Sequence, residues 1–394
     1  MTRRAWRTLL KRISIFGVTG SIGANTVDVA EALGREQFKT VAVTGHSNIA
    51  GLADAAKRLD AEIAVTADPA RLSDLREALT GTGIEAAAGE EALVEAASRP
   101  VDWFMSAIVG AAGLAPTLAA ARTGATIALA NKETLVAAGG LFLAEIERTG
   151  ARLLPVDSEH NALFQCMAAE RGRMERLILT ASGGPFRDHS LEQMRSVTAA
   201  EAAAHPNWSM GLRISIDSAS MFNKSLEMIE AWHLFDVEAD QIEVIVHPQS
   251  IIHSMVGFCD GTILAHLGPP DMRVAIGYAL SYPERKPLPV EKLDFADLAR
   301  LDFQAPDIGR FPAMRLARQA MVPGVAGCVM NGAHEVALDA FIDARIGFLD
   351  MAHLVEETME NLSDLPVASS LDDIYEVDGM ARRVGAELVG RFAA

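Results

Sequence analysis

Two carboxylates stand two residues apart in the segment Pro155-Val-Asp157-Ser-Glu159-His160, directly after an apolar run typical of a strand. In an extended backbone, residues i and i+2 point to the same side, so we expect both carboxylates to face one way. Neighbouring anions repel each other unless a cation lies between them, and oxygen ligands of this kind suit a hard divalent ion such as Mg²⁺ or Mn²⁺. The pattern is common in isolation, and a solvated surface pair is the alternative.

A second polar group, Asn223, Lys224 and Glu227, falls on one turn at the start of an expected helix, with Ser218 upstream. Glu227 is a third candidate anionic ligand. Asn223 and Lys224 near a helix N-terminus are suited to cradle a phosphate group. The alternative is an ordinary surface ion pair between Lys224 and Glu227 at i,i+3 spacing.

Asn131-Lys132-Glu133 follows an expected strand at 127–130. Ligands of open α/β sheets bind at the carboxyl ends of the strands, so a lysine at this place can hold a substrate oxygen. The alternative is a charged start of the next helix.

The loop Gly17-Val-Thr-Gly20-Ser-Ile-Gly23 lies between a first strand and a first helix. Glycines there let the backbone approach a pyrophosphate, which rests on the helix N-terminus. The spacing G-x-x-G-x-x-G departs from the usual dinucleotide fingerprint, and a purely structural turn is the alternative. The second strand is followed by Thr44-Gly45-His46-Ser47 without an acidic residue, which favours NADP over NAD, although His46 can equally be a solvated loop residue.

Short β-type runs and alanine-rich helical stretches alternate over the first 150 or so residues, the pattern of a parallel sheet. We expect strands at 13–17, 39–44, 63–65, 103–106 and 127–130, with helices at 25–33 and 48–59. These elements predict a Rossmann-like, doubly wound α/β domain over 13–156.

The second half predicts an α+β catalytic domain at 157–290, with strands at 177–180, 243–246, 254–258 and 262–267. The Gly- and Pro-containing stretch 182–212 has the character of a mobile lid. A linker at 291–310 then leads to a helical C-terminal domain at 311–394, with helices at 311–321, 329–342, 351–362 and 372–392.

The formal net charge of −17 argues against a nucleic-acid partner, because phosphate backbones require a basic face. An anionic substrate must therefore be captured by a local cationic pocket. Three scattered cysteines indicate a reducing compartment, and no apolar run is long enough to span a membrane. The basic start at 1–12 is interpreted as a disordered extension, with a targeting segment as the alternative, so we expect a cytoplasmic protein.

Seven segments occur in a specific order and spacing: GVTGSIG, LANKE, PVDSEHNA, ASGGPFR, HPNWSMG, DSASMFNKSLEMIEA and HPQSIIHSMV. Together they resemble the 1-deoxy-D-xylulose 5-phosphate reductoisomerase family, from about residue 13 to the C-terminal helices. The resemblance implies isomerisation and NADPH-dependent reduction of this phosphorylated sugar to 2-C-methyl-D-erythritol 4-phosphate, in the non-mevalonate pathway to isoprenoid precursors. It also implies a homodimer that uses Mg²⁺, Mn²⁺ or Co²⁺.

The same resemblance assigns roles to individual residues. The metal ligands are Asp157, Glu159 and Glu227. Lys132 and Ser158 contact the oxygenated end of the substrate, and Lys132 orients oxygens instead of acting as a nucleophile. The phosphate and substrate contacts are Ser182, His205, Ser218, Asn223 and Lys224. Trp208 and Met210 belong to the lid, and Glu230 and His253 lie beside the site. The NADPH contacts are Thr19, Gly20, Ser21, Ile22, Asn131, Glu133 and Gly211, joined by the more variable Gly45, His46 and Ser47.

Two rival functions stay open at this point. A semialdehyde dehydrogenase would need a cysteine nucleophile, but Cys166 and Cys328 lie on expected helices, where cysteines are usually core residues. A non-catalytic NADP sensor would not need the three carboxylates. His334-Glu335 begins like a zinc-protease motif, but residue 338 is leucine where that motif has its second histidine.

Overall fold

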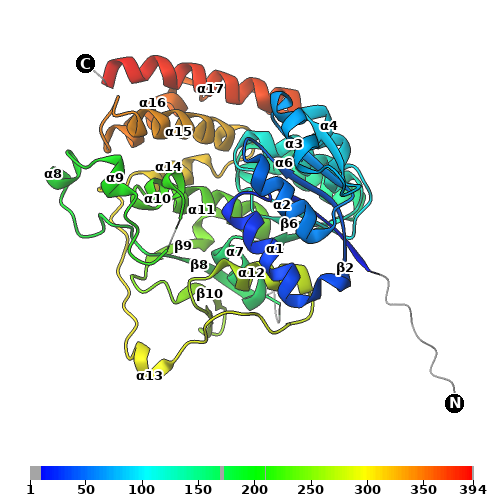
Figure 1. The fold of residues 1–394 in the computed structure, drawn as a ribbon. Helices are drawn as coiled ribbons and strands as arrows, with labels where there is room; N and C mark the ends of the chain where they lie inside the picture. Colours follow the sequence, from blue (N-terminus) through cyan, green and yellow to red (C-terminus); the bar gives the residue numbers. More distant parts are fainter. Residues whose placement is uncertain (1–9, 169–172, 209, 393–394) are drawn as a thin grey trace. The chain divides into compact units, whose positions relative to one another are not determined.

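The computed structural model of the chain describes residues 10–168, 173–208 and 210–392. The chain divides into two compact units, each assembled from separate stretches of sequence (Figure 1). The first comprises Met1–Asn131, Glu145–Val156 and Met272–Pro289, and the second comprises Lys132–Ala144, Asp157–Asp271 and Val290–Ala394. Two features differ from the expected domain ranges: 272–289 belongs to the first unit, and the C-terminal helices share the second unit with the catalytic segment. Most of the expected N-terminal extension, 1–9, lies outside the described residues.

The first unit is built on a seven-stranded parallel sheet in the order β4-β3-β2-β1-β5-β6-β7. The strands are β1 (Lys11–Phe16), β2 (Phe38–Gly45), β3 (Ile63–Thr66), β4 (Glu85–Ala88), β5 (Trp103–Ser106), β6 (Thr126–Leu129) and β7 (Arg152–Pro155). All five expected strands are confirmed, whereas β4, an alanine-rich edge strand, was not predicted. The strand order reverses between β1 and β5, and ligands of doubly wound sheets bind at such a reversal.

Helices accompany this sheet: α1 (Ser21–Gly34), α2 (Ile49–Leu59), α3 (Leu72–Ala78), α4 (Glu90–Ala97), α5 (Leu114–Arg122) and α12 (Met272–Ser281). The ends of α2 follow from its sequence. The Asn48 side chain accepts a hydrogen bond from the Gly51 N–H at the start, and Asp60 adopts a left-handed conformation at the end. Helix α6 (Glu133–Thr149) runs from the second unit into the first and is kinked at Ala138.

The second unit contains a four-stranded mixed sheet in the order β11-β10-β8-β9. Strands β8 (Met174–Ala181) and β9 (Ile242–Val246) are parallel, while β10 (Ile252–Phe258) is antiparallel to β8 and to β11 (Ile263–Leu267). The four strands expected in this part of the sequence are confirmed. Within this unit, β11 is the edge strand next to β10.

Ten α-helices of the second unit follow β7 in the described part of the chain. They are α7 (Ser158–Cys166), α8 (Leu191–Met194), α9 (Ala199–Ala202), α10 (Leu212–Ala219), α11 (Phe222–Phe235), α13 (Phe295–Leu298), α14 (Ala313–Ala320), α15 (Ala326–Ile342), α16 (Asp350–Asn361) and α17 (Leu371–Phe392). The four expected C-terminal helices are confirmed. Short helices α8 and α9, inside the expected lid range, each begin with a capping box.

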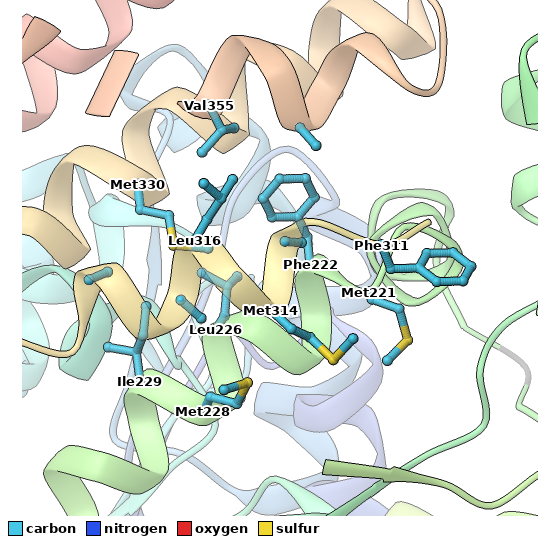
Figure 2. Packing of buried hydrophobic residues seen from close by; sticks show 14 of the residues in the cluster. Met221, Phe222, Leu226, Met228, Ile229, Phe311, Met314, Leu316, Met330 and Val355 are labelled. Carbon is cyan, nitrogen blue, oxygen red and sulfur yellow. The ribbon is translucent and has the colours of Figure 1, made fainter. Parts of the chain in front are cut away.

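One apolar cluster joins the middle of the chain to the C-terminal helices. Figure 2 shows Phe222 and Leu226 of α11, Leu316 of α14, Met330 of α15 and Val355 of α16 converging on the same interior. Full burial of each such side chain stabilises the fold by roughly 1.5–3 kcal/mol. This shared core fixes α11, which carries much of the candidate site. No helix in the described ranges is long and apolar enough to cross a membrane.

Candidate active site

Asp157 and Glu159 lie at the start of α7, not on a strand. Asp157 is the N-cap residue and Glu159 is in the first turn, so the expected extended geometry for this pair was wrong. The chain leaves β7 at Pro155 and turns directly into the helix, which brings both carboxylates to one helix end. The Asp157 side chain makes no capping hydrogen bond and is therefore available to other groups.

The second carboxylate group comes from α11, where Asn223, Lys224 and Glu227 occupy the first turns as expected. Spacings of three and four residues place them on one face of the helix. Asn223 Nδ2 and Lys224 Nζ both donate to the Glu227 carboxylate. Lys224 and Glu227 are nearly fully buried, which excludes the alternative of a surface ion pair.

Two lysines bridge the carboxylates of α7 and α11. Lys132 Nζ lies 2.9 Å from Asp157 Oδ2 and 3.5 Å from Glu227 Oε1, and it donates to Asn223 Oδ1 at 2.7 Å. Lys224 Nζ donates to Glu159 Oε1 at 2.7 Å. Three carboxylates and two ammonium groups are thus gathered in one place, with one excess negative charge when all are ionised. We call this set the carboxylate–lysine cluster.

The carboxylates of the cluster differ in acidity. Burial raises the pKa of Glu227 to about 8, and the charges of Glu159 and Asp157 add to the rise. Burial acts in the same direction on Asp157, but the Lys132 ammonium outweighs it and holds the pKa of Asp157 well below its usual range. Burial alone would lower the pKa of both lysines, but the facing carboxylates outweigh it, and the pKa of each lysine is raised. Both lysines therefore stay charged.

The donor set fits a hard divalent cation. Asp157, Glu159 and Glu227 each offer a carboxylate oxygen, and these three atoms lie within 4.8 Å of one another. Oxygen-only ligands of this kind are those that Mg²⁺ and Mn²⁺ prefer.

A buried pair, His160 and Glu230, lies next to the cluster, and only Glu230 was predicted from the sequence. His160 Nδ1 is 3.2 Å from Glu230 Oε2, and His160 Nε2 is 2.9 Å from the carbonyl oxygen of Glu227. Because that carbonyl can only accept, Nε2 is protonated and donates to it. Glu230 was expected beside the site, whereas His160 was missed although it stands three residues after Asp157, a spacing that places both at one helix end.

Ser182, His205 and Ser218 belong to a second cluster around a glycine turn. Ser182 Oγ is 2.8 Å from His205 Nε2, and a Cβ on Gly184 would lie 2.9 Å from the carbonyl oxygen of Ser218. Only glycine fits that close approach, which holds the turn against the end of α10. Ser158, in contrast, donates its hydroxyl to the neighbouring Glu159.

The residues after His205, within the expected lid range, are held by side-chain contacts. His205 Nδ1 accepts from the backbone N–H groups of Asn207 and Trp208, and Asn207 Nδ2 donates to Ser250 Oγ at 3.0 Å. The Trp208 ring centroid is 6.1 Å from that of His253. Met210 is half-buried.

The glycine loop of the first unit lies at the strand-order reversal. Gly17 has φ of +89°, and a Cβ there would lie 2.4 Å from the carbonyl oxygen of Ala107, so the loops after β1 and β5 touch at this glycine. Helix α1 begins at Ser21 without a side-chain cap, which leaves its first N–H groups available to an anion. This loop contains four of the expected cofactor residues: Thr19, Gly20, Ser21 and Ile22.

Further expected cofactor residues are divided between the two units. Gly45 ends β2, and His46 and Ser47 are exposed just beyond it. Asn131, in the first unit, donates from Nδ2 to the carbonyl oxygen of Gly110 at 3.0 Å. Glu133 and Gly211 belong to the second unit.

Three family models match the chain: 1-deoxy-D-xylulose 5-phosphate reductoisomerase over 13–139, its C-terminal domain over 153–235, and the DXP reductoisomerase C-terminal domain over 267–384. The 1-deoxy-D-xylulose 5-phosphate reductoisomerase of Sinorhizobium fredii is 64% identical over 382 residues, covering 96% of this chain and 98% of the relative. That of Rhizobium meliloti is 62% identical over 384 residues, covering 97% and 98%.

Solved structures agree with these sequence matches. The Zymomonas mobilis enzyme in complex with NADPH is 50% identical, with a TM-score of 0.91 and coverage of 97% of this chain and 99% of that one. A DOX-P reductoisomerase in complex with NADPH, fosmidomycin and magnesium is 40% identical, with a TM-score of 0.91 and coverage of 97% and 98%. The chain belongs to the 1-deoxy-D-xylulose 5-phosphate reductoisomerase family.

Proposed function

We propose that the carboxylate–lysine cluster is the catalytic centre of an enzyme that isomerises 1-deoxy-D-xylulose 5-phosphate and reduces the product with NADPH. The end product is 2-C-methyl-D-erythritol 4-phosphate, in the non-mevalonate pathway to isoprenoid precursors. The observation that carries this assignment is the convergence of three carboxylate oxygens within 4.8 Å of one another, on a chain that matches the family over nearly its whole length.

Asp157, Glu159 and Glu227 are the residues that would hold the divalent metal. When bound, the metal polarises the carbonyl and hydroxyl oxygens of the substrate as a Lewis acid and fixes their orientation. Glu227 would release its proton on binding a cation, because its pKa of about 8 leaves it largely protonated at neutral pH.

The two lysines are proposed to change partners when the site is loaded. Lys132 and Lys224 compensate the three carboxylates in this structure. When a bound cation compensates the carboxylate charge instead, Lys132 is free to orient the oxygenated end of the substrate. Lys224 can then reach a phosphate oxygen together with Asn223. Neither lysine needs to act as a nucleophile in this chemistry.

His205 and Ser182 form a donor for a substrate oxygen. His205 Nδ1 accepts two backbone N–H groups, so Nε2 carries the proton and donates to Ser182 Oγ. Ser182 Oγ also accepts from the Gly184 N–H. The Ser182 hydroxyl therefore keeps its own proton to donate to an anionic oxygen, and burial lowers the pKa of His205 so that the ring stays neutral.

The rival function with a cysteine nucleophile finds no support in Cys166 or Cys328. Burial raises the pKa of Cys166 to about 11 and that of Cys328 to about 12, so neither is a thiolate at neutral pH. All three cysteines are free, which supports a reducing, cytoplasmic location.

A homodimer is also part of the proposal. Ile263 and Leu264 on edge strand β11 and Phe295 on α13 are large apolar side chains exposed to solvent. Edge strands of this kind are templates for pairing with another chain. Sedimentation of the protein at micromolar concentration tests this part separately, since a monomer would contradict it.

The test of the main proposal follows NADPH absorbance with 1-deoxy-D-xylulose 5-phosphate and Mg²⁺ or Mn²⁺, with and without a chelator. Oxidation should need both substrate and metal. Asp157→Asn, which keeps the side-chain shape but removes a charge, should lower kcat/KM by roughly 100-fold or more. Glu243→Gln, in a half-exposed pair with Arg176, is the matched control and should leave activity unchanged. A folded wild type that oxidises no NADPH with either metal would refute the proposal.

A further inference from the structure

His334 on α15 makes two contacts that are unusual for a core residue. Its side chain is buried, and its Nε2 lies 2.8 Å from Asp217 Oδ1 on α10. Its ring stacks on Phe222, with centroids 4.1 Å apart and planes inclined by 18°. The C-terminal part of the chain thus contacts the end of one site helix and the start of the next.

The junction that His334 spans is tight. Helix α10 ends at Ala219, α11 begins at Phe222, and Met221 between them has φ of +64°, a left-handed conformation that non-glycine residues rarely adopt. Ser218 lies on one side of this junction and Asn223 on the other. A small change in the junction would therefore move the residues that we assign to the phosphate group.

The hydrogen bond to Asp217 explains why a histidine occupies this apolar position. An ionised carboxylate can only accept, so Nε2 carries the ring proton. The other ring nitrogen, Nδ1, is buried and has no hydrogen-bond partner among the described residues. A phenylalanine would fill the place without burying an unsatisfied nitrogen, so the ring contributes its donor at a cost to stability.

Neighbouring contacts hold α10 in the same place. Arg213, one turn before Asp217, pairs with Glu335 at 2.5 Å and with Asp339 on α15. On the other side, the Gly184 turn packs against the Ser218–Ala219 backbone. His334 lies between these outer restraints and contacts both α10, at Asp217, and α11, at Phe222.

We propose that His334 is a positioning residue for the phosphate end of the substrate, acting through Asp217 and Phe222 on the backbone that presents Ser218, Asn223 and Lys224. The proposal rests on the proposed function, which supplies the phosphate role of those residues. It concerns substrate affinity, with a smaller effect on turnover expected because Lys224 also contacts Glu159 and Glu227.

Two complementary variants separate the ring from its donor. His334→Phe keeps a ring that can stack on Phe222 but removes the hydrogen bond, whereas His334→Gln keeps an N–H donor at the Nε position and removes the ring. His334→Phe should raise KM for 1-deoxy-D-xylulose 5-phosphate about tenfold or more, the effect of losing one hydrogen bond to a charged group, with kcat changed less than about threefold. His334→Gln should recover part of the affinity. KM for NADPH should not change, and His353→Phe on the exposed face of α16 is the control.

The midpoint of thermal unfolding separates positioning from general stability. His334→Phe should unfold close to the wild-type temperature, because loss of the donor to the largely buried Asp217 carboxylate is offset by loss of the buried, unpartnered Nδ1. A variant with wild-type KM would overturn the proposal, as would a fall in kcat at unchanged KM or a rise in KM matched by His353→Phe.

A measurement without turnover keeps this inference distinct from the proposed function. Inorganic phosphate is titrated against wild type and His334→Phe by calorimetry, and amide hydrogen exchange is followed over 217–223. Weaker phosphate binding and faster exchange in the variant support the positioning role even if wild type fails to oxidise NADPH with the sugar phosphate. Equal binding and equal exchange in the two proteins would refute it.

Discussion

Replacing Lys224 by methionine tests whether the carboxylate–lysine cluster depends on buried charge compensation. Lys224 and Glu227 are 3% and 1% exposed, and the lysine bonds both Glu159 and Glu227. Methionine has similar length and removes the charge, leaving buried carboxylates facing each other with Lys132 as the remaining cation of the cluster. Removing one partner from a buried pair costs about 3–5 kcal/mol. For a unit of this size, that corresponds to a loss of roughly 6–20 °C in the midpoint of thermal unfolding.

The assay is differential scanning calorimetry of wild type and Lys224→Met, first with a chelator and then with Mg²⁺. Ligand at 100 times its Kd stabilises the folded state by about 2.7 kcal/mol, and the more negative variant site should bind Mg²⁺ more tightly. Mg²⁺ should therefore raise the unfolding temperature of the variant by more than that of wild type. Arg176→Met, in a half-exposed pair with Glu243, is the control and should cost less than about 1 kcal/mol with no response to Mg²⁺.

Two outcomes would refute this reasoning. If Lys224→Met unfolds within 2 °C or so of wild type in chelator, the ammonium is not compensating buried charge. If Mg²⁺ stabilises both proteins equally, the cation and the lysine do not act on the same carboxylates.

Two further predictions concern other parts of the chain. Burial lowers the pKa of His233 to about 4, below its value in the unfolded chain. The stability of the fold is therefore full above pH 6.5 and falls by at most about 3 kcal/mol as the pH is lowered towards 4, because the unfolded chain takes up the proton first. Between pH 7 and pH 5 the unfolding temperature of His233→Gln should fall less than that of wild type, and equal falls would contradict the assignment. Gly17→Ala places a Cβ 2.4 Å from the Ala107 carbonyl oxygen and should weaken NADPH binding at least tenfold, about 1.4 kcal/mol, in a fluorescence titration. Gly81→Ala, at a positive φ with open space around it, is the control. If both variants bind NADPH equally well, Gly17 has no role in binding the cofactor.

The spacing of residues in the sequence predicted the site correctly where the residues concerned lie on a single helix or loop. Glu227 and Lys224 are on one face of a helix whose start could be recognised from sequence, and the glycine loop follows a strand with clear β-branched character. The burial of Lys224 was beyond such reasoning, because it depends on elements distant in sequence: α7, whose Glu159 pairs with the lysine, and α14 and α15, which pack against α11.

Each miss has its own physical cause. The Asp157–Glu159 spacing was interpreted as extended because the apolar run before it is a strand, but the helix begins at Ser158. Strand β4 is alanine-rich and lacks the residues that favour β-structure. His160 pairs with Glu230 across two helices that are far apart in sequence, and no local pattern reports such a contact.

The return of α12 to the first unit has a consequence for synthesis on the ribosome. Trp103, on a strand completed early, donates its indole N–H to the carbonyl oxygen of Ala279 at 3.0 Å in a buried setting. A nascent chain therefore exposes this indole and its apolar surroundings until 176 further residues have been added. Fragments that stop near residue 156 should accordingly be prone to aggregation, and the two units cannot be separated by a single cut in the gene.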